Sequence, residues 1–357
     1  MGKVKDIYNM QFINQLTKTL KKSSPDFNEK EFQEAVYLND WESLEFKQRV
    51  RRISTAMFES LPKAYEEVID IFYQAAPSFG GLAGIIFPDY VEQYGLNDWE
   101  KSMEALEFLT PFSTSEFAVR PFFIADQERM VRQMFNWAQS KNEHVRRLAS
   151  EGSRPRLPWG STVPSLKENP LQFITMLEYL FQDDSLYVRK SVANHLNDIS
   201  RIHPTAITKI VEKWQGKDQG TDWILRHASR SLLKQGNRDI LALFGYKASN
   251  KLQIRNLSLI KAAISIGEEL LFSFDLAVET GTKVRLEYAI DYVKNNGNQN
   301  KKVFQITETV VEDGLIKSFS RKQSFKNMTT RKHYPGVHTL HVLVNGEVKA
   351  SKDFLVN

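Results

Sequence analysis

Cysteine is absent from this chain of 357 residues. Without a thiol there is no disulfide framework, no thiolate zinc site and no cysteine nucleophile, and the absence fits a reducing cytoplasm. The first residues, MGKVKDIYNMQF, lack the apolar stretch of a signal peptide. No apolar run approaches the roughly 18 residues of a membrane span. These absences predict a cytoplasmic protein that has no membrane partner.

Acidic residues are missing from one long stretch of the last third. The whole chain carries a net charge of +5, and residues 251–357 hold 16 Lys and Arg against 11 Asp and Glu, whereas residues 1–250 are balanced. No acidic residue lies between Asp313 and Glu347. That stretch contains Lys317, Arg321, Lys322, Lys326, Arg331 and Lys332. Such a one-signed stretch suits a phosphate backbone, although a solvated basic loop would have the same composition.

Several catalytic signatures are also absent. The sequence contains no GxxxxGK[ST], GxGxxG or HExxH motif and no defensible Ser-His-Asp arrangement. His338 and His341 lie close together in a strand-like segment, but their odd spacing directs them to opposite faces. We therefore predict that the protein uses neither a metal ion nor a cofactor.

What is present up to about residue 240 is a helical pattern. Segments such as SLEFKQRVRRISTAMFESL space their apolar residues three and four apart, and Pro or Gly interrupts them at short intervals. The segments HVRRLASEG, YVRKSVANHL and ILRHASRSLL resemble one another, and aligning Val145, Val188 and Leu225 gives spacings of 43 and 37 residues. Periods near 40 residues are typical of HEAT-like helix pairs. The pattern predicts a HEAT-like repeat domain over residues 1–240.

After about Tyr246 the period of the pattern changes to two. Segments such as ELLFSFDLAVE and KVRLEYAIDYV alternate in polarity and are rich in β-branched and aromatic residues. Asn296-Gly297 and Asn345-Gly346 are hairpin signals, because both central turn positions require positive φ. About seven short strands in this length fit an immunoglobulin-like fold. The predicted fold class is an α-solenoid of HEAT-like helical repeats followed by an all-β immunoglobulin-like sandwich over residues 246–357.

The most unusual local sequence is ASEGSRPRLPWG, residues 149–160. A glycine ends the preceding helix and two prolines prevent a new one, so the segment presents Glu151, Arg154, Arg156 and Trp159 from a stiffened backbone. Trp and Arg side chains can stack on bases, and a Trp ring can attract a cationic base. The alternative is an inter-repeat loop whose arginines bind helix carbonyls and whose tryptophan fills the core.

Two further carboxylates are candidates for chemistry. Glu116 follows possible helix caps, so it could instead lie in the first turn of a helix and pair with Arg120. Asp198 lies near a helix end, one turn after Asn194, where simple solvation is the alternative. Neither residue alone specifies catalysis.

A row of basic residues suggests contacts with phosphates. Steps of four would keep Arg226, Arg230, Lys234 and Arg238 on one helix face. Matching places in earlier repeats hold Arg146, Arg147, Arg189 and Lys190, so a basic track could run along the concave face. The alternative is that these residues pack within the repeat array.

The segments TSEFAVRPF, HVRRLASEGSRPRLPW, TDWILRHASRSLLKQG and FPDYVEQYGL give the chain a family resemblance. Over residues 1–240 it resembles the AlkC branch of the AlkD-like DNA alkylation repair glycosylases. The resemblance implies excision of 3-methylcytosine and 1-methyladenine, with 3-methyladenine as a lesser substrate, without rotation of the base into a pocket. It also implies that Glu116 and Glu151 are catalytic and that Arg154, Arg156, Trp159 and Asp198 line the site.

These inferences combine into one functional hypothesis. A base alkylated on a ring nitrogen is already cationic and leaves as a neutral molecule, so carboxylates need only stabilise the sugar cation and place a water. No lysine for a Schiff base is evident near these candidate residues, so the expected product is an abasic site. The predicted catalytic residues are Glu116, Glu151 and Asp198, and the predicted DNA or lesion contacts are Arg154, Arg156, Trp159, Arg120, Asn194, Arg226, Arg230, Lys322, Lys326 and Arg331.

We therefore predict a monomeric, nucleoid-associated DNA glycosylase that acts on double-stranded DNA containing alkylated bases. The basic β domain is expected to grip the duplex, so that the DNA is encircled, because bending DNA costs about 1–6 kcal/mol and requires extra phosphate contacts. A HEAT-repeat scaffold that binds nucleic acid or protein without catalysis is the alternative, since a fold alone does not fix a function.

Overall fold

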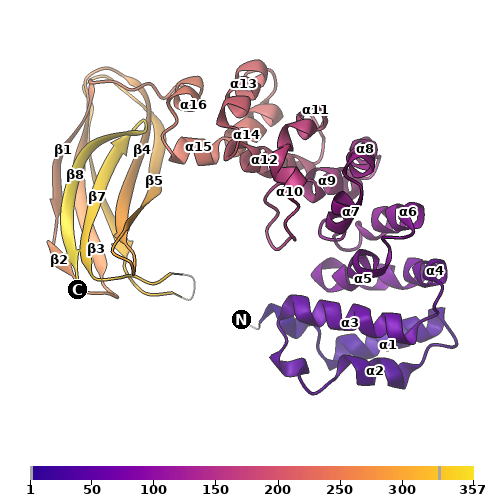
Figure 1. The fold of residues 1–357 in the computed structure, drawn as a ribbon. Coiled ribbons are helices and arrows are strands. Elements are labelled where there is room, and N and C mark those ends of the chain that lie inside the picture. The colour runs from indigo at the N-terminus through magenta and orange to yellow at the C-terminus, as the bar shows by residue number, and fades with distance from the viewer. Residues whose placement is uncertain (1–2, 329–330) are drawn as a thin grey trace. The chain divides into compact units, whose positions relative to one another are not determined.

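The computed structural model describes residues 3–328 and 331–357, and the chain forms two compact units. The first unit comprises residues 1–202 and 216–228, and the second comprises residues 203–215 and 229–357 (Figure 1). The second unit thus takes three helices in addition to the strands. The division into domains at residues 240–246 stays a prediction. Among the described residues, no helix has the length and apolar character needed to cross a bilayer.

The first unit consists of short helices stacked in succession, as Figure 1 shows. Its helices are η1 (Val4–Ile7), α1 (Met10–Ser23), α2 (Glu29–Val36), η2 (Trp41–Ser43), α3 (Phe46–Ser60), α4 (Tyr65–Ala75), η3 (Ala76–Ser78), η4 (Gly81–Ile85), α5 (Ile86–Tyr94), α6 (Trp99–Leu109), α7 (Arg120–Ala125), α8 (Gln127–Trp137), α9 (Glu143–Gly152), α10 (Pro164–Glu168), η5 (Pro170–Phe173), α11 (Ile174–Tyr179), α12 (Leu186–Ser200) and α14 (Gln219–Ala228).

The three helices with similar sequences are neighbours in space. α12 packs against both α9 and α14, and Val145, Val188 and Leu225 are buried. Asn142 caps α9 by accepting a hydrogen bond from the His144 amide, which satisfies one of the free N–H groups of the first turn. The predicted repeat pattern is confirmed, because the aligned apolar positions are the ones that neighbouring helices bury against each other.

The second unit contains three helices and eight strands among its described residues. They are α13 (Pro204–Trp214), α15 (Arg230–Lys234), α16 (Arg238–Leu243), β1 (Leu252–Leu259), β2 (Ala263–Ile264), β3 (Glu269–Val278), β4 (Thr282–Val293), β5 (Gln299–Val311), β6 (Ile316–Ser324), β7 (Gly336–Val344) and β8 (Glu347–Val356).

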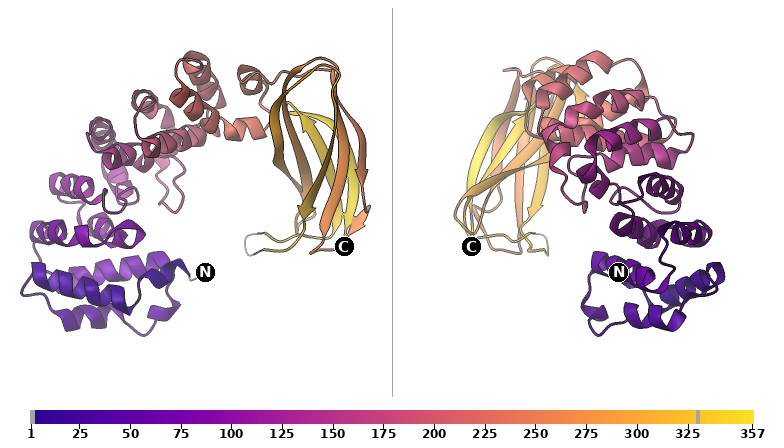
Figure 2. Two further views of the ribbon diagram at one scale, coloured as in Figure 1. Left: turned by 180° about the vertical axis from the view of Figure 1, so that it is seen from behind. Right: turned by 45° about the vertical axis from the view of Figure 1, so that its right-hand side comes forward.

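The strands form two sheets that enclose one core (Figure 2). One sheet has the order β1-β3-β6 and the other the order β2-β8-β7-β4-β5. Alternate residues such as Leu270, Phe272 and Phe274 point into the core, as the period-two pattern predicted. The predicted β-sandwich after the helical repeats is therefore confirmed, and its edge strand β6 carries part of the basic stretch.

The two Asn-Gly turns differ from each other. Asn345 and Gly346 both have positive φ, at 51° and 79°, as a two-residue turn of this kind requires. At the other turn only Gly297 has positive φ, and Lys294 and Asn298 close a longer loop. The hairpin between β4 and β5 was predicted correctly, but its turn type was wrong.

Candidate active site

A non-helical loop after α9 carries the residues of the unusual ASEGSRPRLPWG segment. α9 ends at Gly152, where a Cβ atom would lie 2.7 Å from Val119 Cγ2, so only glycine allows this close packing. Pro155 and Pro158 follow, and the backbone forms turns rather than a new helix until α10 begins. The loop is thus anchored at its start by packing, and its two prolines keep it from forming a helix.

Arg120, at the start of α7, donates hydrogen bonds to the backbone of this loop. Its Nη1 donates to the carbonyl oxygens of Arg154 and Gly152 at 2.9 and 3.3 Å, and its Nε donates to Ser161 at 2.7 Å. The side chain is 1% exposed. Burial, followed by the nearby Arg154, lowers the pKa of Arg120 to about 10, so it stays charged at neutral pH. Arg120 thus supports the loop from inside the protein, and its predicted contact with DNA stays a prediction.

Arg154 bridges two of the predicted catalytic carboxylates. Its Nη1 lies 2.6 Å from Glu151 Oε1, and its Nε lies 2.9 Å from Asp198 Oδ2. The other oxygen of Glu151 accepts a hydrogen bond from Ser191 Oγ at 2.6 Å. All of these side chains are buried. Arg154 therefore lies between the two carboxylates, and its predicted contact with DNA or the lesion stays a prediction.

A second guanidinium, that of Arg147, extends the cluster to Glu116. Arg147 Nη1 forms an ion pair with Glu116, and its Nη2 lies 3.9 Å from Glu151 Oε1. The Tyr187 ring lies under the guanidinium, 4.8 Å from it, and Thr114 donates its hydroxyl to Glu116 at 2.6 Å. The structure thus brings all three predicted catalytic carboxylates into one chain of ion pairs.

The charges of this carboxylate cluster balance when the neighbouring Arg120 is included. Glu116, Glu151 and Asp198 face Arg147 and Arg154, and the charged Arg120 lies close enough to Arg154 and Asp198 for electrostatic interaction. Burial lowers the pKa of each guanidinium of Arg147 and Arg154, but the surrounding carboxylates outweigh it, so both values are raised. Burial raises the pKa of Asp198 above its ordinary value, against the opposing effect of Arg154.

Glu116 does not lie in the first turn of a helix. The residues around it form turns, and α7 begins only at Arg120. Its ionic partner is Arg147, from α9, rather than Arg120. The helix-cap interpretation of Glu116 was therefore wrong, and its carboxylate is held by a tertiary contact.

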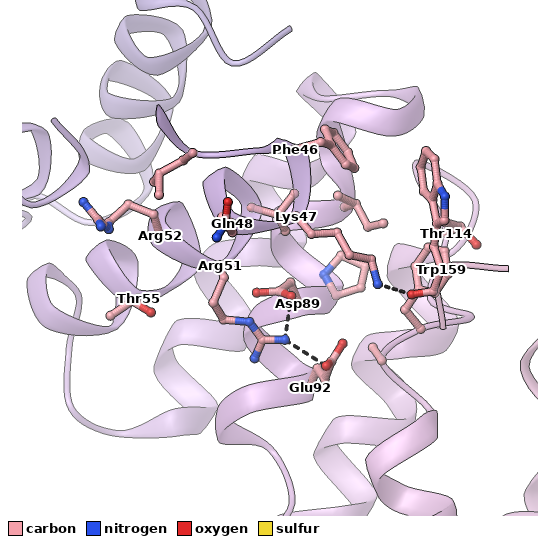
Figure 3. Close-up of a pocket in the computed structure, with 16 residues that line it drawn as sticks. Phe46, Lys47, Gln48, Arg51, Arg52, Thr55, Asp89, Glu92, Thr114 and Trp159 are labelled. Carbon is pink, nitrogen blue, oxygen red and sulfur yellow. Dashed lines mark hydrogen bonds and ion pairs between the residues drawn. The ribbon is translucent and has the colours of Figure 1, made fainter. Parts of the chain in front are cut away.

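Trp159 projects from the loop with its side chain 62% exposed. Its φ is +64°, an unusual value for a residue other than glycine. The Lys47 ammonium donates a hydrogen bond to the Trp159 carbonyl oxygen (Figure 3), and the Phe46 ring lies 6.1 Å away. The interpretation of Trp159 as a core residue was wrong, because most of the indole faces solvent.

Arg156 and Asn194 lie close to the cluster without belonging to its ion pairs. The Arg156 side chain is exposed, while its backbone amide hydrogen-bonds to Asp198. Asn194 is half-buried on α12, one turn before Asp198. The predicted contacts of Arg156 and Asn194 with the lesion stay predictions.

The predicted single basic helix face does not exist. Arg226 lies on α14, Arg230 and Lys234 are the ends of α15, and Arg238 begins α16. Breaks between these helices destroy the regular four-residue step on which the prediction rested. Phosphate contacts of Arg226 and Arg230 stay individual predictions.

The arginines of the earlier repeats join elements within the array. Arg146 forms an ion pair with Asp183, with Nε and Oδ2 2.6 Å apart. Arg189 donates to the Asp183 carbonyl oxygen at 2.7 Å. Their side chains therefore favour the packing interpretation over a continuous basic track.

The basic stretch of the second unit has a different environment. Lys322 and Lys326 are exposed, and Lys322 Nζ lies 3.0 Å from Glu269 Oε1. Arg331 is half-buried, with its guanidinium 5.9 Å from the Tyr292 ring. The intervening residues 329–330 lie outside the described residues. In this stretch, Lys322 thus contacts a carboxylate and Arg331 contacts an aromatic ring.

The sequence interpretation missed the residues that position the carboxylates. Arg147 was grouped with a basic track, Thr114 was interpreted only as a possible helix cap, and Ser191 and Lys47 were not singled out. One signal was available for Arg147, because it precedes Glu151 by four residues on the same helix. The roles of Ser191 and Lys47 depend on contacts between distant helices, which no local pattern shows.

Histidine takes no part in this cluster. His195 is fully buried, and its Nδ1 lies 2.9 Å from the Ser150 carbonyl oxygen. Burial lowers its pKa to about 3, so the ring stays neutral and joins α12 to α9. Within the described residues no group of three or more His, Asp or Glu could hold a metal ion.

Together, the stacked helices, the buried carboxylate cluster and the β-sandwich define a helical-repeat protein with an appended immunoglobulin-like domain. Residues 110–232 match the family model described as DNA alkylation repair enzyme. Residues 253–357 match the model described as the C-terminal Ig-like domain of the uncharacterised protein YhaZ.

Two relatives match over the whole chain. The protein YhaZ of Bacillus subtilis strain 168 is 53% identical over 356 residues, and the match covers 100% of both chains. The solved structure of the Pseudomonas fluorescens alkylpurine DNA glycosylase AlkC, bound to DNA with an abasic site analogue, is 39% identical. Its TM-score is 0.95, and each chain covers 100% of the other. The chain belongs to the AlkC-type DNA glycosylases that carry a C-terminal Ig-like domain.

Proposed function

We propose that this enzyme hydrolyses the N-glycosidic bond of cationic alkylated bases in double-stranded DNA and leaves an abasic site. The proposed substrates are 3-methylcytosine and 1-methyladenine, with 3-methyladenine as a lesser one. The observation that carries the proposal is the buried cluster of three carboxylates and two guanidiniums beside the exposed Trp159.

The carboxylates of the cluster suit the charge of the reaction. The substrate base is cationic, and positive charge moves to the sugar as the bond from C1′ to the base nitrogen breaks. Carboxylates in a buried site stabilise this charge, because electrostatic effects are stronger where water is excluded. The guanidiniums of Arg147 and Arg154 hold the carboxylates in place, so the site needs no rearrangement during the reaction.

The bond changes are those of a hydrolysis without a general acid. The electrons of the glycosidic bond stay on the base nitrogen, and the base leaves as a neutral molecule. The oxygen of water then bonds to C1′, and a carboxylate accepts one proton of that water. Glu116 and Glu151 are the proposed catalytic groups, and Asp198 is the third carboxylate of the site.

Trp159 is the proposed contact with the lesion. An exposed indole can attract a cationic ring through its π face, an interaction worth about 0.5–2 kcal/mol. The fixed backbone and the Lys47 hydrogen bond keep this side chain from collapsing onto the loop. Access without rotation of the base into a pocket is proposed from the resemblance to the AlkC branch.

DNA is the proposed partner of both units. The AlkC relative is described as an alkylpurine glycosylase and was solved on DNA containing an abasic site analogue. In the second unit, the exposed Lys322 and Lys326 with Arg331 supply positive charge suited to phosphates. We propose that these residues add sequence-independent affinity.

The proposal is tested by measuring the release of free methylated base from alkylated DNA in the presence of EDTA, under single-turnover conditions. Glu116→Gln and Glu151→Gln preserve shape and remove charge, and each is expected to lower the rate at least about tenfold, or about 1.4 kcal/mol of barrier. DNA affinity should stay near wild type. Glu128→Gln, at an exposed position on α8, is the matched control and should be fully active.

Full activity in both carboxylate variants would refute the assignment of the site. If the wild-type protein binds the DNA but releases no base, the non-catalytic scaffold is the better interpretation. Dependence of the rate on a metal would contradict the proposed mechanism, which uses only side chains and water.

A further inference from the structure

A cavity of about 410 Å³ lies directly beside the loop that carries Trp159. Phe46, Phe117 and Trp159 contribute aromatic rings to its lining, and Figure 3 shows Phe46 and Trp159 among them. Its volume is in the range of about 300–1,000 Å³ found for sites that bind small molecules. Three aromatic rings around one such space suit a planar ring system as the ligand.

The polar part of the lining comes from α3 and α5. Arg51 Nη2 lies 3.1 Å from Asp89 Oδ1 and 2.8 Å from Glu92 Oε1. Asp89 is also held by Gln93, whose Nε2 lies 2.9 Å from Oδ2. Asp89 and Glu92 belong to the segment FPDYVEQYGL, which the proposed reaction does not use. Their side chains are only 11% and 19% exposed. Such well-ordered carboxylates can accept hydrogen bonds from the edge of a ligand.

The charges around the cavity cancel. Lys47 and Arg51 carry two positive charges, and Asp89 and Glu92 carry two negative charges. Arg52, which also lines the cavity, forms its own ion pair with Asp40, at 3.0 and 3.1 Å. A cavity with balanced charges suits a neutral ligand, such as the base that the proposed reaction releases.

The cavity adjoins the carboxylate cluster through shared residues. Thr114 lines the cavity and donates its hydroxyl to Glu116. Lys47 lies over the Phe117 ring, 4.8 Å from its centroid, and binds the Trp159 carbonyl oxygen. A base that leaves the sugar beside Glu116 therefore has an aromatic, electrically neutral space immediately next to it.

We propose that this cavity binds the excised, neutral methylated base after cleavage and so forms a product site. This inference rests on the proposed function. The aromatic rings contact the heterocycle, Asp89 and Glu92 accept hydrogen bonds from its exocyclic amino group, and Arg51 and Lys47 donate to its unprotonated ring nitrogens. Unpartnered DNA bases have the same chemistry, so the experiment must separate a free base from a base within DNA.

The test titrates free 1-methyladenine and free 3-methylcytosine into the full-length protein by calorimetry, first without DNA and then with abasic-site DNA bound. We expect saturable binding at one site in both states. Glu92→Gln should weaken it at least about fivefold, and Thr55→Trp, which fills the cavity, should abolish it. Glu104→Gln changes an exposed carboxylate beside other aromatic side chains and should bind like wild type.

A kinetic measurement keeps this proposal separate from the proposed function. Added free base should inhibit multiple-turnover excision by the wild-type enzyme, and the degree of inhibition should fall in the Thr55→Trp variant. Absence of free-base binding in both states, or wild-type binding by both cavity variants, would overturn the product site. Binding that abasic-site DNA abolishes would show that a base of the DNA occupies the cavity and would overturn it as well. Base release by the wild type would still establish glycosylase activity in each case.

Discussion

Two sets of basic residues, one in each unit, lie in opposite environments. In the helical unit, Arg147 and Arg154 are buried between carboxylates, and Arg120 is buried under a loop. In the other unit, Lys322 and Lys326 lie at the surface. The buried arginines hold other groups in place, whereas the exposed lysines offer charge to solvent.

The difference follows from the cost of burying charge. A guanidinium removed from water must be paired and hydrogen-bonded in full, and it then fixes the geometry of its partners. An exposed cation has little desolvation cost, keeps its hydration and can exchange counterions for phosphates. Substitutions in the two regions should therefore differ both in size and in the quantity that changes.

The largest effect is expected at Arg154. Arg154→Met leaves Glu151 and Asp198 without their shared buried partner, and loss of one member of a buried pair costs about 3–5 kcal/mol. The free energy of unfolding, measured by urea titration, should fall by that amount. The excision rate is measured for the same variant. Arg132→Met, at an exposed position on α8, is the control. A change at Arg154 as small as that at Arg132 would contradict the comparison.

The next effect concerns the exposed Lys322 and Lys326 and the half-buried Arg331 of the β-containing unit. Replacing Lys322, Lys326 and Arg331 together by Ala should leave stability nearly unchanged and reduce DNA affinity at low salt. The slope of log K against log salt should become shallower by about 0.9 for each phosphate that is no longer neutralised. Substitution is preferable to deletion from residue 246, because α15 and α16 belong to the same compact unit as the strands.

A second triple variant serves as the control for this measurement. Lys294, Lys301 and Lys302 are also exposed in the same unit, and their replacement by Ala removes the same charge. An equal decrease in slope for the two triple variants would mean that net charge, rather than this stretch of the chain, supplies the affinity.

A smaller effect is expected for Trp159, where an exposed residue of the helical unit is proposed to act directly. Trp159→Ala should lower the excision rate of a cationic lesion about tenfold, or about 1.4 kcal/mol of barrier. Stability should change by no more than about 0.5 kcal/mol, because most of the side chain is exposed. A large decrease in melting temperature with unchanged excision by the folded fraction would show that Trp159 is structural. Trp159→Phe should recover part of the rate.

The smallest effect should appear in the pH dependence. Burial raises the pKa of Asp198 above its ordinary 3.8, although Arg154 opposes the shift. If ionised Asp198 is required, excision should be lost as the pH falls through this raised value, and Asp198→Asn should be slower and lack that step. The folded state binds the proton more tightly than the unfolded state, so the contribution of Asp198 to stability is lost as the pH rises through the same window. An acid limb that persists unchanged in the variant would exclude Asp198 as its origin.

Several of these features were accessible from local sequence. The near-40-residue spacing of Val145, Val188 and Leu225 predicted neighbouring helices, because repeats bury equivalent apolar positions against one another. The alternation of residues 269–279 predicted strand β3, because successive side chains of a strand point to opposite faces. The glycine and two prolines of residues 149–160 predicted a loop after α9, because local backbone preferences decide where a helix ends.

Other features depended on tertiary contacts. The caps before Glu116 predicted a helix, but the structure holds that carboxylate with Arg147 from another element. Steps of four predicted one basic helix face from Arg226 to Arg238, but the chain breaks into three helices there. In both cases a local pattern was consistent with two structures, and packing of distant segments selected one of them.

The sequence by itself thus determined where the helices, the strands and the stiff loop lie, because propensity and periodicity are properties of neighbouring residues. It also contained the three carboxylates and the tryptophan of the candidate site. Only the tertiary structure decided that Arg120 and Arg154 are internal supports, that Trp159 is exposed, and that Lys47 reaches the Trp159 carbonyl group. Those outcomes depend on burial and on ion pairs between segments far apart in the chain, and the charge of a side chain does not reveal which partner it will meet.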